Sequence, residues 1–202
     1  RAFPGLNFTE ADLAVGLAHA HSRGCKVYVA LNTNPGPAGL RAWHAAVDRA
    51  ASLGVDAVIC ADMGVLDYAA RRHPAMARHL SVQGSATTHA ALRYYRERFG
   101  IARAVLPRVL SIQQVERLCG QQVVPIEVFA FGSLCIMVEG RCQLSSYVTG
   151  ASPNRHGVCS PAKFVRWDEE PGGVRRISLN GRLIDRFGPD EPAGYPTVCK
   201  GR

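Results

Sequence analysis

Four of the seven cysteines lie in the last third of the chain, in segments rich in glycine and polar residues. Cys135, Cys142, Cys159 and Cys199 follow the pattern C-x6-C-x16-C-x39-C. Four thiolates at such positions can form two disulfides, hold a structural zinc ion or hold an iron–sulfur cluster. Disulfides are disfavoured in a cytosolic chain, and zinc sites usually use closely spaced cysteine pairs, which are absent here. The spacing therefore favours a cluster over zinc without excluding zinc.

The other three cysteines are expected to be structural. Cys25 opens a predicted strand, Cys60 ends one and Cys119 closes a helix, each among apolar residues. A free cysteine in such surroundings behaves as a small buried hydrophobic residue.

The first 130 residues alternate between amphipathic helix patterns and short runs rich in Val, Ile and Ala, which is typical of βα units. Helices are predicted over residues 9–22, 40–53, 65–72, 89–99 and 112–119, and strands over residues 26–31, 57–60, 80–83, 104–106 and 126–129. This order predicts a parallel sheet with right-handed crossovers. Because a complete eight-stranded barrel needs about 250 residues, the five units predict either an open sheet or an incomplete barrel.

Polar residues follow each predicted strand, where both architectures bind their ligands. Asn32, Asp62, Gln83 and Arg108 are the candidate substrate-binding residues, although a helix cap is the commoner role for any one of them. After residue 131 the alternation stops, and only residues 177–184 predict a β-hairpin, with Asn180-Gly181 as its turn.

A family resemblance adds to this interpretation. The segment Glu127-x-Phe129-x-x-Gly132-Ser133-Leu134-Cys135-x-x-x-x-Gly140-x-Cys142-x-Leu144-Ser145 resembles the signature of the collagenase-like peptidase family, the thirty-second family of unknown catalytic type. The resemblance runs from residues 4–10 to residues 194–202. It implies a (β/α) barrel of TIM type, incomplete in this chain, over residues 1–131. It also implies an iron–sulfur segment over residues 132–202, packed on the barrel, with a 4Fe–4S cluster on Cys135, Cys142, Cys159 and Cys199.

Within the family, the stretches VFAFGSLCIM at residues 128–137 and SPAKFVRW at residues 160–167 are similar to the branch of the U subunit of oxygen-independent ubiquinone hydroxylation. RNA-hydroxylating members typically carry a cysteine where this chain has Lys163. The resemblance therefore implies hydroxylation of ubiquinone precursors in a heterodimer with a paralogous V-type subunit, with prephenate as a possible oxygen source. Arg108 would suit that dicarboxylate, because guanidinium binds carboxylates through paired hydrogen bonds. Hydroxylation of tRNA or rRNA bases and proteolysis are the alternatives, and no catalytic residue is identified.

Charge and hydropathy set further expectations. The net charge is +8, and all 24 basic residues except Lys26, Lys163 and Lys200 are arginine, with no run longer than a pair. Scattered charge of this kind favours a solvated surface over a nucleic-acid interface. No stretch approaches the length of a membrane span, so a cytoplasmic protein is expected. The chain starts without methionine, which allows for a piece of something longer.

Overall fold

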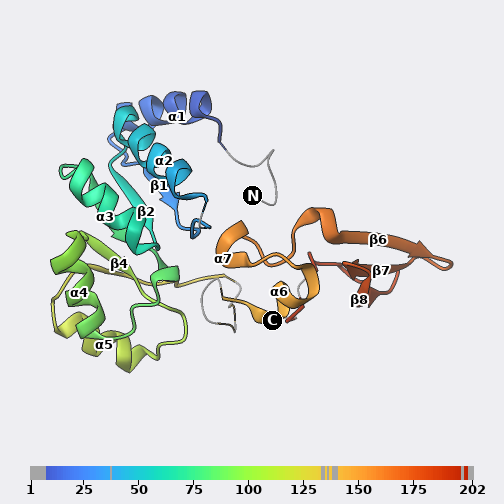
Figure 1. Ribbon diagram of the computed structural model, residues 1–202. Coiled ribbons are helices and arrows are strands. Elements are labelled where there is room, and N and C mark those ends of the chain that lie inside the picture. Colours follow the sequence, from blue (N-terminus) through green and yellow to red (C-terminus); the bar gives the residue numbers. More distant parts are fainter. Residues whose placement is uncertain are drawn as a thin grey trace. The chain divides into compact units, whose positions relative to one another are not determined.

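The computed structural model describes residues 8–36, 38–132, 135, 137, 141–196 and 198–199. The chain divides into two compact units, and each is described by itself (Figure 1). The N-terminal unit is Asn7–Gly132, and the C-terminal unit is Ser133–Arg202 with Arg1–Leu6.

The N-terminal unit alternates helices and strands as the sequence predicts. The elements are α1 (Glu10–Ser22), β1 (Tyr28–Leu31), α2 (Leu40–Leu53), β2 (Ala57–Cys60), α3 (Met63–Arg72), β3 (Ala77–Leu80), the 3-10 turn η2 (Val82–Gly84), α4 (His89–Phe99), β4 (Arg103–Val105), α5 (Ile112–Gly120) and β5 (Ile126–Glu127). The strands form one parallel sheet in the order β1-β2-β3-β4-β5. A parallel α/β fold is therefore confirmed, whereas the described strands do not close into a barrel.

The strand order determines which face of the sheet is covered. Because right-handed crossovers between sequential neighbours place every helix on the same side, one face packs on helices. Val58, Cys60 and Leu80 on that face are fully buried. On the other face Tyr28 and Glu127 of the outer strands are exposed, whereas His79 of the central strand is buried. This one-sided covering differs from a doubly wound sheet, which has helices on both faces.

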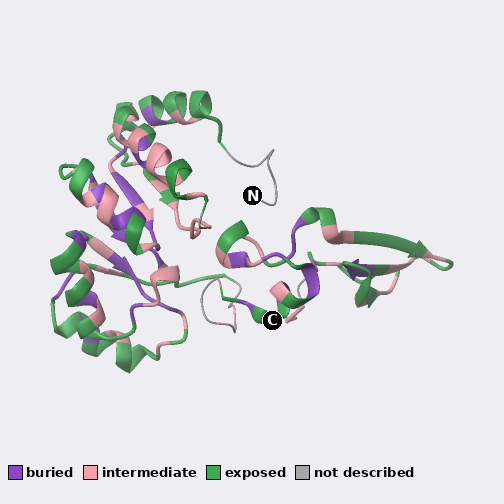
Figure 2. Cartoon of the chain, in the orientation of Figure 1, coloured by how far each residue is buried: buried purple, intermediate pink, exposed green. Residues whose placement is uncertain are grey.

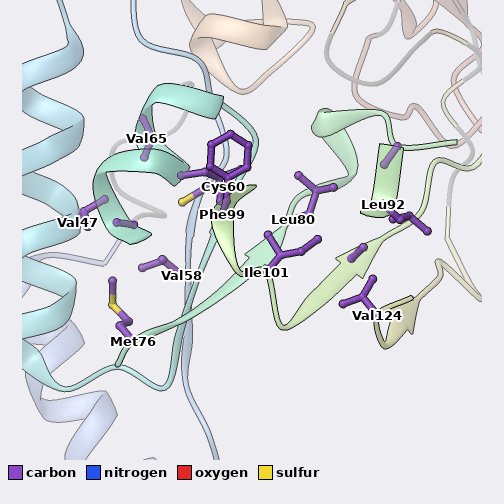
Figure 3. Packing of buried hydrophobic residues seen from close by; sticks show 14 of the residues in the cluster. Val47, Val58, Cys60, Val65, Met76, Leu80, Leu92, Phe99, Ile101 and Val124 are labelled. Carbon is purple, nitrogen blue, oxygen red and sulfur yellow. The ribbon is translucent and has the colours of Figure 1, made fainter. Parts of the chain in front are cut away.

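The buried face meets apolar side chains of the helices (Figure 3). Val47 of α2, Val65 of α3 and Leu92 of α4 have no exposed surface and belong to the same hydrophobic cluster as Val58 and Leu80. Figure 2 shows that the buried positions of this unit lie on the strands and on parts of the helices. Burial on this scale holds the sheet rigid, so the loops at its carboxyl edge start from fixed points.

The third strand lies earlier in the chain than predicted. It starts at Ala77 and ends at Leu80. Of the other predicted residues, Ser81 caps η2, and Val82 and Gln83 lie in it. Arg78 and His79 obscured the strand because they are polar, yet both are buried. Gly84 packs closely on the strand end, since an added Cβ would lie 2.6 Å from Cδ1 of Leu80.

The C-terminal unit contains a three-stranded antiparallel sheet. Its elements are α6 (Gln143–Thr149), α7 (Pro153–His156), η3 (Ala162–Phe164), β6 (Val165–Glu170), β7 (Val174–Leu179) and β8 (Arg182–Phe187), and the strand order is β6-β7-β8. The predicted hairpin is confirmed as β7–β8, with Asn180 and Gly181 both at positive φ. Asn180 Nδ2 also donates to Val148 O of α6 at 2.6 Å, which ties the hairpin to the helix. In the part of the chain that the structure describes, no helix is long and apolar enough to cross a membrane.

Candidate functional site

Cys142 is positioned by the helix that it starts. It is the N-cap of α6, and its Sγ accepts a hydrogen bond from the backbone N–H of Ser145 at 3.4 Å. Cys142 is buried, and the hydroxyl of Ser145 donates to the carbonyl of Cys159. Ser145 therefore connects the two cysteine-bearing segments.

Cys159 lies in a segment whose backbone is held by two side-chain hydroxyls. Partial burial raises the pKa of its thiol, and a hydrogen bond with Ser160 partly offsets this rise. Tyr195 OH donates to Ser160 O at 2.8 Å, so the segment that carries Cys199 is tied beside Cys159. Hydrogen bonds from Ser145 and Tyr195 thus connect the segments that carry Cys142, Cys159 and Cys199.

Cys135 stands between residues outside the described part of the chain. Its Sγ contacts Met137 O at 3.8 Å. All four candidate cysteines are free thiols. Among the described residues, no group of three or more His, Cys, Asp or Glu side chains is close enough to hold a metal ion, so ligation by these four cysteines stays a prediction.

The prediction that Cys25, Cys60 and Cys119 are all buried is wrong for two of them. Cys60 is buried, but Cys25 and Cys119 are exposed. Cys25 lies in the loop before β1 rather than in the strand, and Cys119 lies in the last turn of α5 on its outer side. Burial raises the pKa of the Cys60 thiol to about 12.

Thiol labelling checks this difference. Because the thiolate is the nucleophile, iodoacetamide at pH 8 is expected to modify Cys25 and Cys119 of the native protein and to spare Cys60. Peptide mass spectrometry reads the three sites separately. Urea should make all three reactive, and equal labelling of Cys60 before urea is added would contradict its burial.

The four predicted substrate-binding residues all follow strands of the parallel sheet, so they share its carboxyl edge. Asp62 has a structural role there, since its Oδ1 accepts from Val65 N at 3.0 Å and caps α3. Asn32 follows β1 and is partly exposed. The sequence allowed a helix-capping role for each of these residues, and the structure shows that role for Asp62.

Gln83 lies in η2, directly after β3. Its Oε1 is buried, as is Oγ of Ser85, and neither atom has a hydrogen-bond partner in the described structure. Ser85 also has φ of 52°, a left-handed conformation that is uncommon for residues other than glycine. Buried polar atoms without partners are rare, which makes this turn a candidate ligand contact.

Arg108 follows β4 and packs on an aromatic ring. Its Cζ lies 5.2 Å from the ring centroid of Phe129, which follows β5. Phe129 is 55% exposed. In the sequence, Phe129 was noted only as part of the family signature, and its contact with Arg108 was not predicted. An arginine and an aromatic residue that follow neighbouring parallel strands could have indicated this contact.

Ser145 and Tyr195 were also missed as positioning residues. Both hold backbone at Cys159 and Ser160 through side-chain hydroxyls. Residues 144–145 and 195 stand in the stretches that carried the resemblance, which was the available signal. The hydrogen bonds themselves join residues far apart in the chain, so only the fold reveals them.

Comparison with known proteins gives relatives of two kinds, some with names that concern RNA and one named a collagenase. "tRNA hydroxylation protein P" of Escherichia coli (strain K12) is 35% identical over 90% of this chain and 39% of the relative. "23S rRNA 5-hydroxycytidine C2501 synthase" of the same strain is 30% identical over 90% of this chain and 27% of the relative. "Collagenase" of Porphyromonas gingivalis (strain ATCC BAA-308 / W83) is 32% identical over 79% of this chain and 40% of the relative. The chain therefore spans at most about two fifths of the length of these relatives.

These names overturn the ubiquinone prediction. The similarity is to proteins of tRNA and rRNA hydroxylation, so ubiquinone precursors, prephenate and the heterodimer with a V-type subunit are withdrawn. The expectation that nucleic acid is an improbable partner is wrong as well. It depended on scattered arginines and on Lys163, whose Nζ packs 4.8 Å from the ring centroid of Phe164. A lysine in place of a cysteine at position 163 therefore did not distinguish the ubiquinone branch of the family from the RNA branch.

The remaining comparison concerns the family as a whole. Residues 1–169 match the family described as "Peptidase family U32". The match covers all five parallel strands, α6, α7 and most of β6. The chain belongs to peptidase family U32.

Proposed function

We propose that this chain is part of a protein that hydroxylates a pyrimidine base in RNA, with tRNA as the favoured substrate. The observation that carries the proposal is the 35% identity to tRNA hydroxylation protein P over 90% of this chain. Because tRNA is a cytoplasmic molecule in bacteria, we place the activity in the cytoplasm. The net charge of +8 suits attraction to a polyanion.

We further propose that Cys135, Cys142, Cys159 and Cys199 hold a 4Fe–4S cluster. The donor set suits such a cluster, since thiolates are its usual ligands, and hydrogen bonds from Ser145 and Tyr195 connect the segments that carry Cys142, Cys159 and Cys199. The N–H of Ser145 donates to Sγ of Cys142, a kind of contact that moderates thiolate charge in cluster sites. When bound, the cluster would supply one-electron transfer.

The residues around these thiols would hold the ligand-bearing segments in place. Ser145 fixes the backbone at Cys159, and Tyr195 fixes the backbone at Ser160. If water supplies the oxygen, exchanging a ring C–H for C–OH releases two protons and two electrons, which a separate two-electron acceptor must finally take. A redox group carried by the same protein is consistent with that requirement.

The complete protein is proposed to contain a closed (β/α) barrel. Sequential parallel strands with helices on one face are the arrangement of a barrel segment, and the open face carries Tyr28, His79, Arg103 and Glu127. Arg103 Nη1 lies 3.1 Å from Glu127 Oε2, and the rings of Tyr28 and His79 meet edge to face at 4.8 Å. Such polar contacts suit the interior of a barrel near its ligand.

Proteolysis has weaker support, although one relative is named a collagenase. Nucleophilic proteolysis needs a hydroxyl or thiol activated by histidine. His73 Nε2 contacts Asp48 Oδ1 at 2.6 Å, but the neighbouring hydroxyl, that of Tyr68, donates to the same carboxylate and not to the imidazole. His21 instead pairs with Asp56, which also accepts from Val27 N.

The experiment is a nucleoside analysis in the organism that carries the gene. Deleting the gene is expected to remove a hydroxylated pyrimidine nucleoside from total tRNA or from 23S rRNA, and restoring the gene should bring it back. Liquid chromatography with mass spectrometry, run separately on the two RNA fractions, measures the nucleosides. Unchanged hydroxylated nucleosides in both fractions would contradict the proposal, and cleavage of gelatin by the anaerobic protein would favour the collagenase alternative.

A further inference from the structure

The carboxyl ends of β3, β4 and β5 adjoin along one edge of the parallel sheet. We propose that the loops at this edge bind one unpaired pyrimidine base of the RNA, with Phe129 and Arg108 stacking on it and Gln83 and Ser85 contacting its polar edge. The inference rests on the proposed function and names the part of the chain that would hold the base.

The stacking surface consists of Arg108 and Phe129. The guanidinium lies over the ring at 5.2 Å from its centroid, and more than half of Phe129 is exposed. Their strands are neighbours, with Ala104 beside Ile126, and both residues follow the carboxyl ends of these strands. Unpaired RNA bases stack on aromatic rings and on guanidinium planes, and every base offers a face for such contact.

The polar contacts come from the turn after β3. Oε1 of Gln83 and Oγ of Ser85 are both buried and lack hydrogen-bond partners among the described residues. Leaving a buried acceptor unpaired destabilises a fold unless another molecule supplies the donor. The turn is held tightly all the same, because Gly84 packs against Leu80 and Ser85 keeps a left-handed backbone. A turn that keeps unpaired oxygens in a strained conformation is typical of a binding site.

The chemistry of these groups selects the ligand. A carboxamide presents one acceptor and two donors in a plane, and a hydroxyl adds a further donor or acceptor. The pyrimidine edge offers matching groups, the N3–H and carbonyl oxygens of uracil or the amine of cytosine. Phe129 and Arg108 would therefore stack on the face of the base, while Gln83 and Ser85 would form hydrogen bonds with the polar groups at its edge.

The test measures RNA binding by the purified chain. Fluorescence anisotropy with a labelled oligouridylate of about eight nucleotides is the probe, a length within the range of single-stranded binding sites. Phe129→Ala is expected to weaken binding about tenfold, and Phe129→Trp to retain it, because loss of one base–aromatic stack has an effect of this size. Arg93→Ala is the control for Arg108→Ala, since Arg93 is an exposed arginine of α4 and its loss changes the charge equally. Arg108→Ala should weaken binding clearly more than Arg93→Ala.

A second comparison tests the edge contact. The parent chain should bind oligouridylate at least fivefold more tightly than its N3-methyl counterpart, and Gln83→Leu should abolish that preference. The inference is overturned if the parent chain does not bind oligouridylate, or if Phe129→Ala binds oligouridylate as tightly as the parent does. None of these results touches the nucleoside analysis, so the proposed function can stand while this site fails.

Discussion

Replacing Cys142 with serine is expected to remove the iron from the protein and leave the helix that Cys142 starts intact. Serine is a favoured N-cap and can accept the same bond from Ser145 N, so α6 keeps its start. Its hydroxyl is a poor replacement for a thiolate ligand of a cluster. The parent chain purified without oxygen should contain about four irons and four sulfides per chain, and the variant should lose most of both.

The control for this variant is Cys25→Ser. Cys25 is exposed and belongs to the N-terminal unit, so its replacement should leave iron and sulfide at the parent level. Iron and acid-labile sulfide analyses with visible absorption spectra measure both proteins. Full iron in Cys142→Ser would exclude Cys142 as a ligand, and about one zinc per chain in the parent would replace the cluster by a structural zinc site.

The parallel sheet could be predicted because its signal is local. Helices with a capping residue and a terminal glycine, such as α4 between Thr88 and Gly100, alternate with short β-branched runs. β3 was displaced because Arg78 and His79 are polar residues in a buried strand, and only tertiary contacts make them acceptable there. β6 was missed because its exposed residues Trp167, Asp168 and Glu169 give no alternating pattern.

Only part of the candidate site could be predicted, because sequence patterns show local features and not contacts between distant residues. Cysteine spacing and strand ends are visible in the sequence, and they pointed to Cys142 and Gln83. The unpaired oxygen of Ser85 and the pairing of Arg108 with Phe129 depend on a turn and on two strands far apart in the chain. The choice between RNA and ubiquinone failed because Lys163 alone cannot identify a substrate.

The stability of the N-terminal unit is expected to depend on the buried side chain of Arg78. Only 9% of the residue is exposed, and burial lowers the pKa of its guanidinium. Its hydrogen bonds go to backbone carbonyls, from Nε to Phe99 O at 2.8 Å and from Nη1 to Met76 O at 2.7 Å. Longer bonds reach the carbonyls of His73, Pro74 and Gly100. One side chain therefore ties the ends of α3 and α4 to the start of β3.

Arg78→Met is expected to lower the free energy of unfolding of the N-terminal unit by about 3 kcal/mol or more. Methionine fills much of the volume but removes the guanidinium donor from five carbonyl groups, of which that of His73 still accepts from Met76 N. A buried unpaired group costs about 1–3 kcal/mol, less where water enters. Arg78→Lys should lose about half as much, because an ammonium group keeps the charge but cannot span both helix ends. Arg93→Met is the control and should stay within about 0.5 kcal/mol of the parent, as exposed substitutions usually do.

Urea unfolding of the variants in a Trp167→Phe background makes this measurement, since Trp43 then reports on the N-terminal unit alone. The midpoint should fall for Arg78→Met with an unchanged slope, which would identify a loss of native-state contacts. A midpoint equal to that of Arg93→Met would mean that water satisfies the five carbonyls as well as the guanidinium does. In that case the position of β3 would depend on the apolar residues around Leu80, and the buried arginine would have no part in fixing the edge where Gln83 and Ser85 lie.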